Sequence, residues 1–271
     1  MSDGLNGPFL LAMDLDGTAC NSRARLGERT KEALERFRVR GNIVCFATGR
    51  REVDMLSFGD DDRFADYLLL NTGGKLVRTS DRTVLFREAV DPEAARTLIT
   101  HCLAEGLQLH VLDGMYWAVN RWNDGLTEYV EELGRAPVPY GSLSEVPWTH
   151  LEGFMVTADL VPVTRYIERE GLPLKCLASE PDCVDIMPAG VSKWEGIRRL
   201  AEMIGIPHRR IAAAGDYDND LEMIRKAGIG IAVANALPHV REAADYVTPN
   251  DNDHDAAADI AEMLLAIQDE S

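Results

Sequence analysis

The sequence predicts an α/β protein with a doubly wound parallel sheet as its core and a smaller α+β domain inserted into it. Apolar runs of strand length alternate with helical stretches at both ends of the chain, which is typical of a parallel sheet covered by helices. This rhythm changes between residues 86 and 187, where pairs of short strands follow single helices. Acidic and polar side chains come directly after several of the apolar runs.

The first and last parts of the chain supply the expected parallel sheet. Residues 9–13 form an unbroken apolar run, which is typical of a strand buried on both faces. Further strands are expected at residues 42–47, 67–70, 210–214, 230–233 and 246–248. Helices are expected at residues 28–40, 221–226 and 236–244.

The middle of the chain predicts an antiparallel sheet with helices on one face. Helices are expected at residues 92–105, 124–133 and 161–170, and strands at 107–112, 116–120, 154–158, 174–178 and 183–186. The order helix–strand–strand occurs at both ends of this region, which is a weak internal symmetry. The expected domains are therefore a core of residues 1–85 and 188–271 and an insert of residues 86–187.

The charge balance bears on partners and substrates. The chain has 28 Lys and Arg against 45 Asp and Glu, a formal charge of −17. This excess disfavours nucleic acid or an anionic membrane surface as a partner, and an anion-binding site would need a local metal ion or lysine. The five cysteines are scattered without metal-site spacing. With no expected signal peptide or membrane span, they indicate reduced thiols and a cytoplasmic location.

The segment Asp14-Leu15-Asp16-Gly17-Thr18 is the most informative motif. Its two carboxylates emerge at the carboxyl end of the first apolar run, where open α/β sheets place their ligand sites. An ordinary turn at the end of a strand would also explain Asp and Gly at this point. The motif alone therefore favours a catalytic role only modestly.

Two further motifs follow expected strands. Thr48-Gly49 offers a hydroxyl and backbone N–H groups suited to phosphate oxygens, although a helix N-cap is the commoner use of this pair. Gly215-Asp216-Tyr217-Asp218-Asn219-Asp220 gathers three carboxylates and an amide, which would repel one another without a cation. Oxygen ligands of this kind suit Mg²⁺. The alternative is a solvated acidic turn.

Lys193 is the expected partner of these carboxylates. It stands where the chain returns from the insert, and it could neutralise the acidic groups and a bound phosphate. Most single lysines are solvated surface charges, so the position alone is weak evidence.

In this order, the four motifs resemble those of the haloacid dehalogenase (HAD) superfamily of phosphotransferases, and the insert resembles the type-IIB cap of the Cof-like sugar phosphatases. The resemblance implies that Asp14 is the nucleophile and Asp16 the general acid and base. It implies Mg²⁺ held by Asp14, the Asp16 carbonyl and Asp216. The implied phosphate-binding residues are Leu15, Thr48, Gly49, Lys193 and Asn219, while Asp218 and Asp220 orient the metal shell.

The sequence thus predicts a Mg²⁺-dependent phosphatase that hydrolyses a small phosphomonoester, such as a sugar phosphate, through an aspartyl-phosphate. A phosphomutase would use the same two aspartates and return the phosphoryl group to its substrate. A protein that binds a phosphorylated metabolite without turnover is the third alternative. The sequence indicates neither the physiological substrate nor the oligomeric state.

Overall fold

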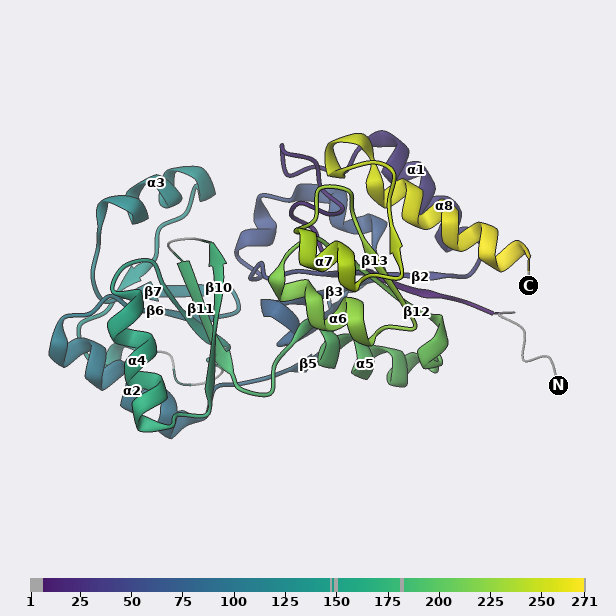
Figure 1. Ribbon diagram of the computed structural model, residues 1–271. Helices are drawn as coiled ribbons and strands as arrows, with labels where there is room; N and C mark the ends of the chain where they lie inside the picture. Colours follow the sequence, from purple (N-terminus) through teal and green to yellow (C-terminus); the bar gives the residue numbers. More distant parts are fainter. Residues whose placement is uncertain (1–6, 147, 149–150, 181–182, 271) are drawn as a thin grey trace. The chain divides into compact units, whose positions relative to one another are not determined.

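The computed structural model describes residues 7–146, 148, 151–180 and 183–270 (Figure 1). The chain divides into two compact units. The core unit comprises Met1–Thr48, Phe58–Phe86 and Ser192–Ser271, and the cap unit comprises Gly49–Ser57 and Arg87–Val191. The segment Gly49–Ser57 is the main difference from the division expected from the sequence, which placed it in the core.

The core unit contains an eight-stranded sheet in the order β14-β13-β12-β1-β2-β3-β4-β5. The predicted doubly wound α/β fold is confirmed. The pairs from β14 to β3 are all parallel, while β4 runs antiparallel to β3. The strands are β1 (Leu10–Met13), β2 (Ile43–Ala47), β3 (Tyr67–Leu70), β4 (Lys75–Arg78), β5 (Val84–Arg87), β12 (Ile211–Gly215), β13 (Ile229–Ala232) and β14 (Tyr246–Val247).

Helices cover the core sheet. The core helices are α1 (Glu28–Val39), α5 (Lys193–Ile204), α6 (Leu221–Lys226), α7 (Pro238–Ala243) and α8 (Ala256–Asp269). Every residue of β1 is buried, as its unbroken apolar run predicts. Leu10 and Ala12 belong to the same hydrophobic cluster as Trp194 and Ile197 of α5. In Figure 1, α1 and α8 lie side by side.

Four of the helices and strands of the core unit were not predicted. The strands β4 and β5 extend the sheet beyond β3, α5 follows the cap unit, and α8 follows β14. The apolar positions of α8, which include Ile260, Ala261 and Leu264, are buried. Their helical spacing is visible in the sequence, so this helix could have been found. Within the described residues, no helix has the length and apolarity to cross a membrane.

The cap unit contains a six-stranded sheet in the order β10-β11-β9-β6-β7-β8. Its pairs are antiparallel, as expected, except for the parallel pair of β7 and β8. The strands are β6 (His110–Asp113), β7 (Tyr116–Val119), β8 (Val138–Pro139), β9 (Gly153–Val156), β10 (Leu174–Glu180) and β11 (Cys183–Pro188). The helices are α2 (Pro92–Glu105), α3 (Asp124–Leu133) and α4 (Leu160–Glu170).

The two faces of the cap sheet have different coverings. One face packs against α2 and α4 in a cluster that includes Val111 and Phe154. Side chains alternate along a strand, so Leu112 and Trp117 lie on the opposite face. Leu126 of α3 packs with them there. The prediction of helices on one face is therefore wrong for α3, because its apolar side chains point to this second cluster.

His110 is a buried polar residue on this second face. The indole N–H of Trp117 donates a hydrogen bond of 2.9 Å to His110 Nδ1. The neutral ring must then carry its proton on Nε2, a buried atom with no hydrogen-bond partner among the described residues. Burial, together with the positive charge of Arg51, lowers the pKa of His110 to about 3.

This burial predicts a pH-dependent stability. Between pH 6.5 and 3 the unfolded state binds a proton at His110 that the folded state does not, so stability falls as the pH falls through this window. From pH 7 to pH 5 the wild type should lose about 2 kcal/mol more unfolding free energy than His110→Gln. Urea titrations followed by tryptophan fluorescence measure this difference. His101→Gln, at a partly exposed cap histidine, is the control, and equal pH dependence in wild type and His110→Gln would contradict the prediction.

Candidate active site

Two adjacent parallel strands deliver the first two acidic side chains. Met13 at the end of β1 lies opposite Ala214 in β12, and the Asp14 N–H donates to the Ala214 carbonyl at 3.0 Å. Asp14 and Asp216 therefore leave the sheet at the same edge, just past the ends of the strands. This is the edge at which parallel α/β sheets bind their ligands.

Lys193 joins this edge from the start of α5. Ser192 caps the helix, because its hydroxyl accepts a hydrogen bond of 3.2 Å from the Glu195 N–H. Gly73 has a φ of +104°, and a Cβ there would lie 2.1 Å from the Ser192 carbonyl oxygen. Only glycine allows the backbone to approach the start of α5 so closely.

The Lys193 ammonium binds two carboxylates. Its Nζ lies 2.6 Å from Asp14 Oδ1 and 2.6 Å from Asp220 Oδ1, and the lysine is only 1% exposed. Asp220 is also completely buried. Its other oxygen accepts from the N–H groups of Asp216 and Tyr217 at 3.0 and 3.2 Å. Both Asp220 oxygens are thus engaged within the protein.

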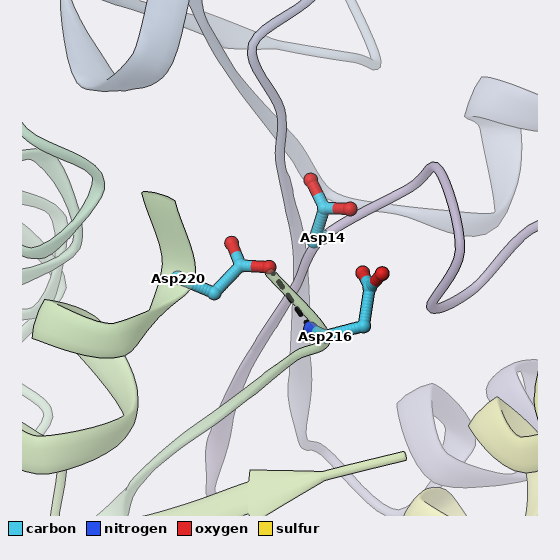
Figure 2. A group of neighbouring side chains, drawn as sticks. All are labelled: Asp14, Asp216 and Asp220. Carbon is cyan, nitrogen blue, oxygen red and sulfur yellow. Dashed lines mark hydrogen bonds between the residues drawn. The ribbon is translucent and has the colours of Figure 1, made fainter. Parts of the chain in front are cut away.

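Asp14, Asp216 and Asp220 form a compact acidic cluster (Figure 2). One oxygen atom from each of the three carboxylates lies within 4.8 Å of the others. The Thr18 hydroxyl donates to Asp216 Oδ1 at 2.7 Å and fixes that carboxylate. Three carboxylates face a single ammonium, so the cluster has an uncompensated negative charge that a cation would relieve.

The pKa values of the cluster reflect this crowding. Burial raises the pKa of Asp14 well above its ordinary value, and the charge of Lys193 opposes that rise. Burial also raises the pKa of Asp216 to about 6. Burial by itself would lower the pKa of Lys193, but Asp14 and Asp220 raise it above its ordinary value, so the lysine is charged.

The remaining predicted residues have different surroundings. Thr48 is buried at the end of β2, and its backbone bonds to Leu69 and Thr72 at 2.9 and 3.0 Å. Gly49 follows it in the chain. Leu15 is buried beside Asp14, whereas the Asp16 side chain is exposed. Asn219 Oδ1 is buried without a hydrogen-bond partner among the described residues.

Asp218 lies outside the cluster of Asp14, Asp216 and Asp220. Its exposed carboxylate lies 2.6 Å from His239 Nε2. Asp218 and Asp220 both belong to a short 3₁₀ turn, in which successive side chains point about 120° apart. Asp220 therefore turns inward and Asp218 outward, and of the two only Asp220 belongs to the acidic cluster.

Two asparagines that the sequence analysis missed brace the first motif. The Asn235 side-chain amide donates to the Gly17 carbonyl at 2.7 Å, and that of Asn252 donates to the Cys20 carbonyl at 2.9 Å. The Asn252 N–H in turn donates to Asn235 Oδ1 at 3.1 Å. These residues lie more than 200 positions from the motif, and nothing in the local sequence indicates their contacts.

The fold has an α/β core with an inserted α+β unit, and a buried acidic cluster lies at the ligand-binding edge of the core sheet. The family model of haloacid dehalogenase-like hydrolases matches residues 11–260. The chain belongs to this family. The predicted enzyme class, an HAD-type phosphoric monoester hydrolase, is confirmed.

Individual relatives cover nearly the whole chain. A 5-amino-6-(5-phospho-D-ribitylamino)uracil phosphatase of Bacillus subtilis, YitU, is 25% identical over 93% of this chain and 95% of its own. The HMP-PP phosphatase of Cronobacter sakazakii is 26% identical over 84% of this chain and 85% of its own. The solved HAD subclass IIB sugar phosphatase BT4131 matches with a TM-score of 0.81 at 24% identity, covering 96% of this chain and 99% of that one. This last likeness shows the fold.

Proposed function

We propose that the protein is a Mg²⁺-dependent phosphatase that hydrolyses a small phosphomonoester through an aspartyl-phosphate on Asp14. The observation that carries the proposal is the buried lysine that holds Asp14 beside Asp216 and Asp220. A carboxylate fixed in this way at the ligand-binding edge of the sheet is suited to attack an electrophile. The net negative charge around it calls for a cation before an anionic substrate can approach.

The donor set fits Mg²⁺. The side-chain donors of the cluster are oxygens, which a hard divalent cation prefers. Since both Asp220 oxygens already accept hydrogen bonds, the ligands we propose are Asp14, Asp216 and the Asp16 carbonyl, with Asp220 behind them. When bound, Mg²⁺ would offset the repulsion between these carboxylates and the phosphate.

The chain's own residues account for both chemical steps. Asp14 attacks phosphorus, and the bond to the leaving-group oxygen breaks as Asp16 donates its proton to that oxygen. Asp16 then takes a proton from water, whose oxygen attacks the phosphorus of the aspartyl-phosphate. Inorganic phosphate leaves and Asp14 is regenerated. The exposure of Asp16 suits a group that must meet both a leaving alcohol and water.

We assign phosphate binding to Leu15, Thr48, Gly49, Lys193 and Asn219. For Asn219 the donor to a phosphate oxygen would be the side-chain NH₂ group, because Oδ1, which is buried without a partner among the described residues, can only accept a hydrogen bond. The charged Lys193 supplies the positive charge that the transferring oxygens need.

The substrate we propose is a small phosphorylated metabolite in the cytoplasm. The named relatives are phosphatases of a phosphoribityl compound and of HMP-PP, and their modest identity leaves the particular metabolite open. A phosphomutase is the alternative reaction at the same two aspartates, and it would return the phosphoryl group to the substrate.

The proposal predicts metal-dependent release of phosphate. We expect hydrolysis in the presence of Mg²⁺, and none in the presence of EDTA, within a panel of sugar phosphates, nucleotides, pyridoxal phosphate and an aryl phosphate. Asp14→Asn should abolish turnover, and Asp16→Asn should lower kcat by about 10²–10⁴-fold because it removes the general acid and base. Phosphate assays measure both effects. Asp218→Asn removes the same charge outside the cluster and is the matched control.

Two results would contradict this prediction. Unchanged turnover in Asp14→Asn would exclude this residue as the nucleophile. Transfer of phosphoryl groups between sugar phosphates without release of phosphate would favour the mutase.

The proposed ligand set predicts a specific loss of metal affinity. Calorimetric titration with Mg²⁺ should show that Asp216→Asn weakens binding by more than about tenfold, because a ligating oxygen is lost. Asp218→Asn has the same net charge and should stay within about twofold of the wild type, since its carboxylate points to His239. Equal losses in the two variants would mean that only overall charge matters and would exclude Asp216 as a ligand.

A further inference from the structure

The segment Gly49–Ser57 is grouped with the cap unit although both its flanking residues are anchored in the core unit. On one side, the Thr48 backbone bonds to Leu69 and Thr72. On the other, the Phe58 ring packs edge-on against Phe46 at 6.1 Å between centroids. We call this segment the strap.

Arg51 attaches the strap to the cap sheet. Its guanidinium carbon lies 5.5 Å from the ring centroid of Trp117, which is in β7. Its Nε and Nη2 each donate a bond of 2.6 Å to Asp54, also in the strap. The arginine is only 6% exposed, and a buried guanidinium is retained only where it is paired and stacked in this way.

The surface that receives Arg51 belongs to the second hydrophobic cluster of the cap sheet. The hydrogen bond from Trp117 to the buried ring of His110 fixes the indole, and Trp117 itself is 2% exposed. The aromatic face and the carboxylate of Asp54 thus hold the guanidinium from two directions. Asp54 engages Nε and Nη2, and Trp117 contacts the guanidinium, so these contacts suit Arg51 to position the strap.

The strap begins directly after Thr48, in the turn to which phosphate binding is assigned. Arg51 lies only three residues after Thr48, so a contact that fixes Arg51 also restricts the backbone of the intervening Gly49. We propose that Arg51 is a positioning residue whose contact with Trp117 sets the phosphate-binding geometry of the Thr48–Gly49 turn. This inference rests on the proposed function, since it takes that turn as a phosphate contact.

The test compares the full-length wild type with Arg51→Met, Arg51→Lys and Trp117→Leu. Inorganic phosphate is the probe, titrated calorimetrically in the presence of Mg²⁺, and urea titration establishes that each variant is folded. We expect phosphate affinity to fall by about tenfold or more in Arg51→Met and Trp117→Leu, and by less in Arg51→Lys, which keeps a cation over the ring. The double variant Arg51→Met/Trp117→Leu should bind phosphate no more weakly than the single variant with the lower affinity, because both changes remove the same contact.

Arg96→Lys is the matched control. Arg96 stacks on Trp148 at 4.8 Å within the same unit and is not part of the strap, so this change should leave phosphate affinity within about twofold. Acetyl phosphate, whose leaving group is small, should lose kcat/KM in the Arg51 variants as much as a larger ester does.

Three outcomes would overturn the inference. These are unchanged phosphate affinity in folded Arg51→Met, an equal loss in Arg96→Lys, and a loss of kcat/KM confined to the larger ester, which would make Arg51 a contact for the leaving group. Phosphate binding is measured without turnover. A wild type that binds phosphate but hydrolyses no ester would therefore contradict the proposed function and leave the inference about Arg51 standing. A wild type that binds no phosphate would overturn both proposals.

Discussion

One buried ammonium group organises the acidic cluster at the edge of the core sheet. Lys193 binds Asp14 and Asp220 at the same distance, and Asp220 in turn holds the backbone of the loop that carries Asp216. Three segments that are far apart in the sequence are thereby brought together at the ends of β1 and β12 and the start of α5. Removing the lysine would leave two buried carboxylates unpaired, which is among the costliest changes a protein interior can undergo.

The same arrangement leaves the acidic cluster with an excess of negative charge. One ammonium cannot balance three carboxylates, and burial raises the pKa values of Asp14 and Asp216 as a result of their desolvation. In a chain with a formal charge of −17, an anionic substrate gains nothing from the surrounding surface. A cation bound by Asp14 and Asp216 would offset the repulsion between the carboxylates and would also attract an anionic substrate.

The acidic cluster at the edge of the core sheet could be predicted from the sequence because local signals determine its place. Unbroken apolar runs locate parallel strands, and the residues just after Met13 and Ala214 must then share an edge. Three features depend on contacts between distant residues and could not be predicted. They are the Asn235 and Asn252 brace, the outward turn of Asp218, and the attachment of Arg51 to Trp117. The missed helices α5 and α8 are different, because their apolar spacing was visible in the sequence.

The central claim is that this edge exists to make Asp14 a nucleophile. The most direct measurement is to mix Asp16→Asn with acetyl phosphate and Mg²⁺, quench in acid, and identify the phosphorylated peptide by mass spectrometry. Loss of the general base slows hydrolysis of the intermediate, so the account predicts a phosphoryl group on Asp14. Turnover of acetyl phosphate with no phosphorylated peptide, or with the label on another residue, would contradict it.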